Sequence, residues 1–571
     1  MSRPVRIGNI SGFYGDRIDA AREMVEQGAV DVVCGDYLAE LTMLILAKAQ
    51  ARDGGVGYAR TFLTQVEQIL PACVERGIRI VANAGGLDPA GLADAVRAVA
   101  DEQGLGVRVA HVEGDDLRGD LAAITPPVGG TPVSANAYLG GWGIAQALAA
   151  GADVVVTGRV TDASLVLGPA AWWHGWAHDD WDPLAGAVVA GHVIECGPQA
   201  TGGNYPFLDE ITDRRYPGFP IAEVAADGSS VITKPEGTGG LVSVGTVTAQ
   251  LLYELGPPAY LGPDVTTHFD TIRLEQTGAH RVAVTGVRGS PPPDTLKVAL
   301  NDVGGYRNTM TLVLTGLDIE AKAAHAEELL FGILDRDSFD EVDVRLLRFD
   351  HPDAAANPEA TAHLRITVKS ADRRVAGRAF SNATMQLALG GYAGFHTTTP
   401  PTDASLFGIY RPAAVPRSAV THTVVLPDGE RCTVADPPEF ATEKPQVTPP
   451  VRRGEQSKGP SRTVPLGTVA GTRSGDKGGD ANIGVWARDD AGHAWLAGFL
   501  TPQRVRALLG PETADLDVEV FDLPNLRAVN VVVHGLLGDG VASATRPDPQ
   551  AKGLGEYLRS RLVEIPEELL P

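Results

Sequence analysis

The sequence predicts an α/β protein that is built from three parts. In residues 1–225, short apolar strands alternate with helical segments of about 10 to 15 residues, which is the pattern of strand–helix–strand units around a parallel sheet. Longer strands with fewer helices follow over residues 226–435, and residues 464–571 mix strands and helices. These patterns indicate a parallel-sheet α/β lobe, a second mixed α/β lobe and a small α+β domain.

The first lobe is expected to alternate strand and helix from its start. Strands are predicted where β-branched residues cluster, and helices where apolar residues recur every three to four positions. The expected strands are residues 5–10, 30–34, 77–82, 107–112 and 152–158. The expected helices are residues 16–29, 38–51, 88–103 and 137–151, with a further helix between residues 51 and 77.

The rest of the chain divides at a proline-rich stretch. Strands are expected at residues 270–278, 281–289, 309–316, 342–349 and 363–370 in the second lobe. Residues 434–463 hold six prolines and no periodicity, so residues 436–463 are predicted to be a linker. In the small domain, strands are expected at residues 465–476, 481–489, 494–501, 518–523 and 528–537, and helices at 502–510 and 552–563.

The composition excludes several classes of protein. A net charge of -23 and an isoelectric point near 5.0 provide no basic footprint for nucleic acid. The four cysteines form no CxxC pair, which fits a reducing compartment. The sequence has neither a signal-peptide pattern nor an apolar run of about 18 residues. We therefore expect a cytoplasmic protein without membrane partners, and a homo-oligomer because large enzymes often form symmetric assemblies.

Polar residues follow the predicted strands of the first lobe. Ligands of parallel α/β sheets bind outside the carboxyl ends of the strands, so these residues are candidates for a site. They are Asp36, Asn83, Gly85, Gly86, Arg159 and Asp162. Arg159 can bind a carboxylate or phosphate and Asp162 can act as a base, or the two can form an ion pair that closes their own loop.

Several motifs together carry a resemblance to a known family. GDYLAELTM, NAGG, VVTGRVTDASL, GHVIECGPQATGGNY and AGTRSGDKGGDANIGVW occur in order, and the chain resembles the acyclic terpene utilisation protein AtuA family over nearly its whole length. The resemblance implies a ferredoxin-like C-terminal domain and a pathway whose intermediates are branched acyl-CoA thioesters. The loop NAGGLDP has Asp88 where the family pattern NAGGxNP has asparagine, so no role passes to that position.

A glycine cluster precedes an amphipathic helix that is expected over residues 244–255. Backbone N–H groups at a helix N-terminus favour an anion, and a neighbouring lysine adds charge. The candidate anion-binding residues are Lys234, Gly237, Thr238, Gly239 and Gly240. The sequence lacks GxxxxGK[ST], which disfavours nucleotide triphosphate cleavage. The two remaining interpretations are a phosphate or CoA site and a structural glycine turn.

The segment GHVIECGPQATGGNY gathers several reactive residue types. A buried carboxylate can act as a general base, and amides can stabilise an enolate oxygen. The candidates are His192, Glu195, Cys196, Gln199, Thr201 and Asn204. Glu195 is the preferred base. Cys196 is either a nucleophile or a small buried filler, and His192 is either catalytic or held by a structural hydrogen bond.

Two further loops offer alternatives. Asp476 and Lys477, in the glycine-rich segment SGDKGGDANIG, predict an anion-binding nest, a lid or a tight turn. The sequence contains no HExxH and no paired cysteines, so no metal is predicted. The segment GNISGFYG follows the first strand without matching GxGxxG, and Asp36 lies about 20 residues later, as in NAD(P)-binding proteins.

These observations favour an enzyme of acyclic terpenoid or branched-chain acid catabolism that acts on an acyl-CoA thioester by hydratase or lyase chemistry. No cofactor is certain, and coenzyme A enters as part of the substrate. Two alternatives stay open. One is an accessory or scaffolding subunit of an acyl-CoA carboxylase pathway, with the small domain as its docking module, and the other is an NAD(P)-dependent oxidoreductase.

Overall fold

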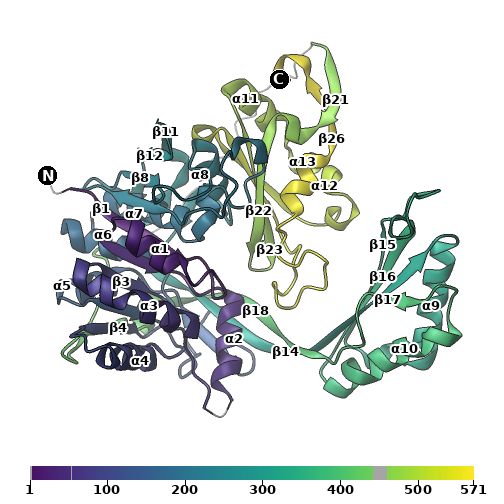
Figure 1. Ribbon diagram of the computed structural model, residues 1–571, viewed down its shortest axis with the longest axis horizontal. Coiled ribbons are helices and arrows are strands. Elements are labelled where there is room, and N and C mark those ends of the chain that lie inside the picture. The colour runs from purple at the N-terminus through teal and green to yellow at the C-terminus, as the bar shows by residue number, and fades with distance from the viewer. Residues whose placement is uncertain (1–2, 53, 442–458) are drawn as a thin grey trace. The chain divides into compact units, whose positions relative to one another are not determined.

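The computed structural model describes residues 3–52, 54–441 and 459–571, and it divides into two compact units (Figure 1). The first unit contains residues 1–301, 410–541 and 548–571, and the second contains residues 302–409 and 542–547. Most of the predicted linker at residues 436–463 lies outside the described residues.

Five parallel strands form the centre of the first unit. In order across the sheet they are β1 (Val5–Ser11), β2 (Val32–Gly35), β3 (Arg79–Ala82), β6 (Val154–Thr157) and β4 (Val109–Glu113). Antiparallel strands extend this sheet to eleven strands. They are β7 (Ile221–Val224), β8 (Ser230–Thr233), β12 (Arg281–Thr285) and β11 (Arg273–Gly278) beside β1, and β19 (Thr423–Val425) and β20 (Arg431–Thr433) beside β4.

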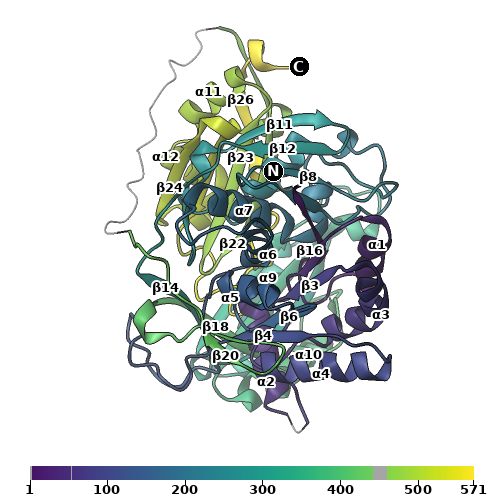
Figure 2. The same cartoon turned by 90° about the vertical axis from the view of Figure 1, so that its left-hand side faces the viewer.

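Helices cover both faces of this sheet. Alternate side chains of each strand point to opposite faces: Val33 and Val154 pack in one core, and Val32 and Val155 pack in the other. The first face is covered by α1 (Ala20–Gln27), α3 (Arg60–Arg76) and α4 (Pro89–Glu102), and the second by α5 (Trp142–Ala149), α6 (Ser164–His174) and α7 (Trp181–Ile194) (Figure 2). Burial on both faces explains why the parallel strands are apolar throughout.

The remaining elements of this part connect the sheet to its surroundings. They are α2 (Glu40–Gln50), β5 (Ser134–Ala137), α8 (Val244–Leu251), β9 (Ala259–Leu261), β10 (Thr266–His268) and β13 (Arg288–Ser290). The last three form a small antiparallel sheet. Residues 226–301, expected in the second lobe, therefore belong with the first one, because β8, β11 and β12 extend the main sheet through long-range pairing that no local sequence pattern displays.

The second unit has its own antiparallel sheet and core. Its elements are β14 (Thr295–Thr315), α9 (Ile319–Ile333), β15 (Glu341–Arg348), β16 (Thr361–Ser370), α10 (Phe380–Gly390), β17 (His396–Thr397) and β18 (Ser405–Pro416). The strands β14 and β18 begin or end in the first unit. Leu312, Leu364 and Ile366 pack against Ala326 and Leu330 of α9 and against Phe380 of α10.

The small domain is a four-stranded antiparallel sheet with helices. Its sheet order is β22 (Ala470–Lys477), β23 (Asp480–Ala487), β25 (Ala528–Val533) and β24 (Val518–Leu523). Its helices are α11 (Asp490–Phe499), α12 (Pro502–Leu509) and α13 (Leu554–Ser560), and β21 (Ser461–Pro465) pairs with β26 (Leu562–Pro566). The predicted α/β fold class, with two lobes and a small α+β domain, is thereby confirmed.

One predicted strand of the small domain is wrong. Residues 494–501 lie mostly in the helix α11. The Asp489 side chain accepts a hydrogen bond from the Gly492 N–H at the N-terminus of that helix, which stabilises the first turn. Trp495 and Phe499 are four residues apart and stack at 4.6 Å between ring centroids, as one helix face requires.

Two buried asparagines join the small domain to the loop after α8. The Asn482 Oδ1 accepts a hydrogen bond from the Glu254 N–H at 2.8 Å. The Asn530 Nδ2 donates to the carbonyl oxygens of Leu255 at 2.9 Å and Gly256 at 2.8 Å. Both asparagine side chains are completely buried. Water cannot reach their amide groups, so these hydrogen bonds within the protein satisfy them instead.

The change Asn530→Ala tests this junction. It leaves two buried carbonyl oxygens without a donor, so we expect it to lower the free energy of unfolding by about 1 to 3 kcal/mol. Urea unfolding of the full chain measures the loss. The exposed Asn357 serves as control, since Asn357→Ala should leave stability within about 0.5 kcal/mol of the wild type. Equal stability of both variants would contradict the account of the junction.

Candidate active site

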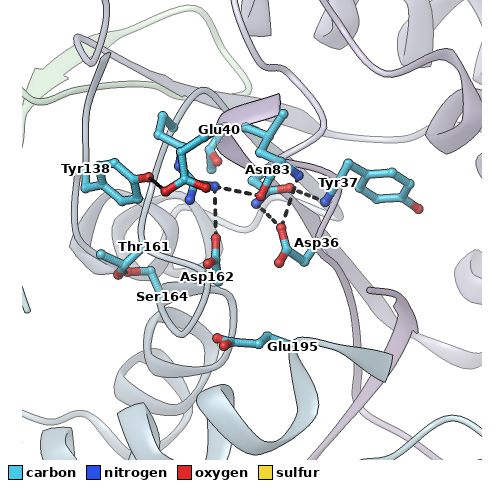
Figure 3. A network of polar contacts seen from close by, with 12 residues as sticks. Asp36, Tyr37, Glu40, Asn83, Tyr138, Thr161, Asp162, Ser164 and Glu195 are labelled. Atoms are coloured by element: carbon cyan, nitrogen blue, oxygen red, sulfur yellow. Dashed lines mark hydrogen bonds and ion pairs between the residues drawn. The ribbon is translucent and has the colours of Figure 1, made fainter. Parts of the chain in front are cut away.

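Polar side chains meet at the carboxyl ends of the central parallel strands. Asp36 follows β2, Asn83 follows β3, and Arg159 and Asp162 follow β6. Because these strands are parallel neighbours or next neighbours, their ends share one edge of the sheet. Glu195 joins them from the C-terminal end of α7 (Figure 3).

Asn83 holds the carboxylate of Asp36. The Asn83 Nδ2 donates a hydrogen bond to the Asp36 Oδ1 at 2.6 Å, and the Asn83 Oδ1 accepts one from the Tyr37 N–H at 2.8 Å (Figure 3). Asn83 is completely buried and Asp36 is 6% exposed. The amide therefore fixes the position of a carboxylate that water barely reaches.

Arg159 lies inside the cluster and connects two loops. Its Nη1 donates hydrogen bonds to the Leu38 carbonyl oxygen at 3.0 Å and to the Asp162 Oδ1 at 2.9 Å. Its guanidinium carbon is 4.2 Å from the centroid of the Tyr138 ring. The Arg159 side chain is 4% exposed, whereas that of Asp162 is 31% exposed. The predicted ion pair forms, and it leaves the Asp162 carboxylate open to a ligand.

Three carboxylates lie close enough to influence one another. Burial raises the pKa of Asp36 well above its usual range, and the nearby Asp162 and Glu195 raise it further. Burial likewise raises the pKa of Glu195, with added effects from Asp162 and Glu254. Carboxylates that share a buried site do not all ionise together. The surroundings of Asp36 and Glu195 therefore favour the protonated form of each carboxyl group.

His192 and Cys196 flank Glu195 in uncharged form. The His192 Nδ1 is 3.1 Å from the Glu195 Oε1, and burial lowers the pKa of this histidine to about 4. Burial raises the pKa of the Cys196 thiol well above its usual range, and Glu195 raises it further. A nucleophilic cysteine needs surroundings that lower its pKa. These surroundings therefore disfavour a nucleophilic role for Cys196 and favour a packed, uncharged thiol.

The small domain brings charged groups to the same region of the first unit. The Lys477 Nζ is 5.3 Å from the centroid of the Tyr260 ring, which in turn lies 5.8 Å from the His192 ring. The Asp476 carboxylate is 4.0 Å from the Lys552 Nζ. Burial raises the pKa of Asp476 to about 7, and Glu254 adds to this effect. Asp476 and Lys477 therefore belong to the wider site.

Sequence patterns alone did not identify Glu40, Tyr138 or Lys297. The Tyr138 hydroxyl donates to the Glu40 Oε1 at 3.3 Å, and the Lys297 Nζ lies 3.6 Å from that oxygen. Burial alone would raise the pKa of Glu40, but Lys297 and Arg159 hold it at about 2. Lys297 lies in the long strand β14, where no motif distinguishes it from an ordinary strand residue.

The glycine cluster before α8 forms a structural turn. The Lys234 Nζ donates to the Thr238 carbonyl oxygen at 2.6 Å, and the Gly240 N–H donates to the Asp213 carbonyl oxygen at 2.9 Å. A Cβ on Gly239 would lie 2.4 Å from the Arg215 carbonyl oxygen. The helix itself begins at Val244 behind a capping box. These contacts engage Lys234 and the Gly240 N–H within the chain and favour the structural turn over the anion site.

Other candidates of the sequence also have structural contacts. Gly85 packs against the Thr157 carbonyl oxygen, and the Thr201 hydroxyl donates to the Gly218 carbonyl oxygen at 2.6 Å. The Gln199 side chain accepts a hydrogen bond from Arg473. Further candidates with structural roles are Gly86 and Asn204, which adopt positive φ, and Gly237 and Thr238, which belong to the turn.

The segment after β1 does not resemble a nucleotide loop in space. A Cβ on Gly12 would lie 2.6 Å from the backbone carbonyl carbon of Cys196, and one on Gly8 would meet Met24. These glycines therefore allow the Cys196 backbone and the Met24 side chain, rather than a ligand, to lie close to this segment. Asp36, expected to bind a ribose, is hydrogen-bonded to Asn83. The NAD(P) alternative gains no support from these contacts.

Within the described residues 3–52, 54–441 and 459–571, no three His, Cys, Asp or Glu side chains converge as metal ligands would. No helix in the same ranges has the length and apolar character needed to cross a membrane.

The fold and the site define a class: an α/β protein with a cluster of buried carboxylates at the carboxyl edge of a parallel sheet. Two family models match it. One, described as acyclic terpene utilisation family protein AtuA, matches residues 5–426, and another, described as AtuA ferredoxin-like domain, matches residues 464–564. The chain belongs to the AtuA family, which associates it with the use of acyclic terpenes. None of the curated proteins compared with the chain matches it.

Asp115 supports the site from behind. Its Oδ2 accepts hydrogen bonds from the Arg159 N–H and from the Asn136 Nδ2, both at 2.8 Å. Burial raises the pKa of Asp115 to about 7. A carboxyl group with a raised folded-state pKa contributes stability that is complete below its unfolded pKa and lost as the pH rises through the folded value.

Asp115→Asn should therefore reduce the pH dependence of stability. The amide oxygen can accept the same two hydrogen bonds without ionising. Between pH 4 and 7 we expect the wild-type free energy of unfolding to lose up to about 1.4 kcal/mol per pH unit through this group, and the variant to lose less. Urea unfolding over this pH range measures the slopes. Asp101→Asn, at an exposed position, is the control, and parallel curves for all three proteins would contradict the assignment.

Gly239→Ala tests the structural interpretation of the glycine turn. The added Cβ would overlap backbone atoms of Arg215 and Tyr216, so we expect a loss of about 1 to 3 kcal/mol in stability. Gly129→Ala is the matched control because a Cβ there meets nothing within 4 Å. Thermal unfolding measures both. A variant at Gly239 with wild-type stability would instead favour a loop kept open for a ligand.

Proposed function

We propose that this protein is an enzyme of acyclic terpenoid or branched-chain acid catabolism that adds a group to, or removes it from, an acyl-CoA thioester by acid/base chemistry. The observation that carries the proposal is the buried cluster of Asp36, Asp162 and Glu195, in which burial and like charges raise the pKa of two members. Perturbed carboxylates of this kind are typical of general acids and bases.

The proposed reaction is the elimination of water from a hydroxyacyl thioester, or its reverse. In elimination, one carboxylate of the cluster accepts the proton from the carbon next to the thioester carbonyl. Glu195, in its protonated form, donates its proton to the departing hydroxyl, so the C–O bond breaks and water leaves as the double bond forms. No covalent intermediate on Cys196 is needed, in accord with the high pKa of its thiol.

Cations beside the cluster support an anionic substrate. The Lys297 side chain is 46% exposed although its Nζ lies 3.6 Å from Glu40 and 4.5 Å from the centroid of the Tyr138 ring. Lys477 approaches from the small domain over Tyr260. A carboxylate or phosphate of the substrate would find two ammonium groups near the carboxylates that perform the chemistry. The family assignment supports a branched, terpenoid acyl group.

The accessory-subunit alternative has less support. A docking module should expose a contiguous apolar patch. Within the described residues 464–571, the large apolar side chains with high exposure are Tyr557 and Leu562, and two side chains make a small patch. The buried polar cluster has no role in such a subunit, whereas acid/base catalysis uses it directly.

Glu195→Gln tests the proposed function. With branched hydroxyacyl-CoA and enoyl-CoA esters as substrates, we expect kcat to fall roughly 100- to 10,000-fold because the amide cannot transfer a proton. Glu26→Gln at an exposed surface position should keep wild-type activity, as should Cys196→Ser. A thermal shift by the same esters should persist in the Glu195 variant, since binding to the folded state raises stability.

Two outcomes would remove the proposal. If no CoA ester shifts the melting temperature of the wild type, the substrate class is wrong. If Glu195→Gln retains the wild-type rate with an active ester, the carboxylate is not the acid or base, and the cluster has another role.

A further inference from the structure

The strand β15 lies at the edge of the sheet in the second unit. The order of that sheet is β15-β16-β14-β17, and β15 pairs along its whole length with β16, from Glu341 opposite Lys369 to Arg348 opposite Ala362. Within residues 302–409 and 542–547, no strand pairs with its other edge. An unpaired edge presents a row of backbone donors and acceptors to another strand. This strand is eight residues long and contains no proline.

A hollow of about 680 Å³ opens along this strand. Its lining includes Val342, Val344 and Leu346 of β15 and Ala323 and Ala324 of α9. The three β15 side chains are only partly buried although they pack against the core of the unit. The space beside the edge therefore offers apolar surface as well as backbone groups.

The charges of this segment are arranged symmetrically about Val344. Acidic residues precede it, at Asp340, Glu341 and Asp343, and basic residues follow it, at Arg345 and Arg348. Glu341 has Leu347 as its counterpart and forms an ion pair with Lys369 of its own copy. If two copies of the strand pair antiparallel with Val344 at the centre, residues equally far before and after Val344 face each other. Asp343 then opposes Arg345 of the second copy, and Asp340 opposes Arg348. The apolar Val342 likewise faces the apolar Leu346 of the second copy.

Neighbouring registers lose this match. If the centre moves to Asp343, Glu341 faces Arg345 but two copies of the aspartate oppose each other, and a centre at Arg345 brings two arginines together. Opposite charges that face each other across a strand pair stabilise the pair, and like charges destabilise it. The sequence of the strand therefore selects one register of self-association.

The pairing inside the unit adds a second electrostatic reason. Arg345 stands directly opposite Arg365 on β16, an arrangement of like charges, and its Nε is 2.9 Å from the Asp343 Oδ2 of the same strand. In the symmetric pairing, Asp343 of the second copy lies on the other side of Arg345. Arg345 of each copy then lies near two Asp343 carboxylates, one from each copy. Their negative charge compensates for the repulsion between Arg345 and Arg365.

We propose that two copies of this chain associate through β15, antiparallel and centred on Val344, so that their two sheets become continuous. The backbone edge supplies hydrogen bonds, and the paired charges set the register. The hollow beside α9 accommodates the apolar β15 side chains of the second copy, which are only partly buried in the single chain. Phe349, which follows the strand and is 55% exposed, adds apolar area at each end of the interface.

Cross-linking of the full chain tests the register. In Val344→Cys the two Cβ atoms of the pair would be roughly 4.5 Å apart, at the upper end of the distance that a disulfide spans. We expect mild oxidation to give a covalent dimer that reducing agent dissolves. Val303→Cys, another exposed valine position in the second unit, should stay monomeric on denaturing gels, as should the wild type with its four native cysteines.

Charge exchange tests the electrostatics in sedimentation equilibrium. Asp343→Arg and Arg345→Asp should each weaken the dimer at least about tenfold, and the double exchange should restore it because the acid and base again face each other. Thermal unfolding of each variant shows whether the unit still folds. A wild-type chain that is monomeric at about 100 µM, a dimer that neither single exchange weakens, or failure of Val344→Cys to cross-link would each overturn the proposal.

Discussion

The carboxylate of Asp36 is buried at the carboxyl edge of the sheet, and the surrounding structure must compensate for it. A buried carboxylate requires hydrogen bonds, a positive partner or a proton. Asn83 provides a hydrogen bond, and Arg159 provides positive charge while it joins the loops of Leu38 and Asp162. All of these groups follow parallel strands. The alignment of the strands therefore places the buried carboxylate and the groups that stabilise it at one edge of the sheet.

The small domain completes this arrangement rather than forming a separate module. Asn482 and Asn530 bind the backbone of residues 254–256 through buried amides, and the strand β22 ends at Lys477 beside Tyr260. Buried polar contacts of this kind tolerate few alternative positions, because a displaced amide leaves carbonyl oxygens without a donor. Most of the small domain therefore belongs to the same compact unit as residues 1–301.

The two glycine-rich loops show how the same residue type serves different ends. At Gly239 and Gly240 the missing side chain admits another part of the backbone. The Gly240 N–H donates to the Asp213 carbonyl oxygen, and the Gly239 carbonyl oxygen accepts from the Gly218 N–H. A glycine cluster before a helix is compatible with both a ligand site and a structural turn. In both cases another group must come close to the backbone, and only the identity of that group, a ligand or another part of the chain, differs. Cys196 poses the same problem: its position in a reactive segment suggested either a nucleophile or a buried filler, and only its surroundings in the fold, burial and Glu195, raise the pKa of its thiol.

Local pattern was sufficient for the parallel strands and for the polar residues that follow them, because alternation of strand and helix and the chemistry of strand ends are visible within short segments. The pattern therefore predicted Asp36, Asn83, Arg159 and Asp162 as neighbours, whereas Glu195 was predicted separately, from the reactive residue types of its own segment. It could not place Lys297 and Tyr138 beside Glu40, nor extend the main sheet with β8, β11 and β12. These contacts join residues far apart in the chain, and burial, which raises the pKa of Asp36 and Glu195, exists only when the unit has folded.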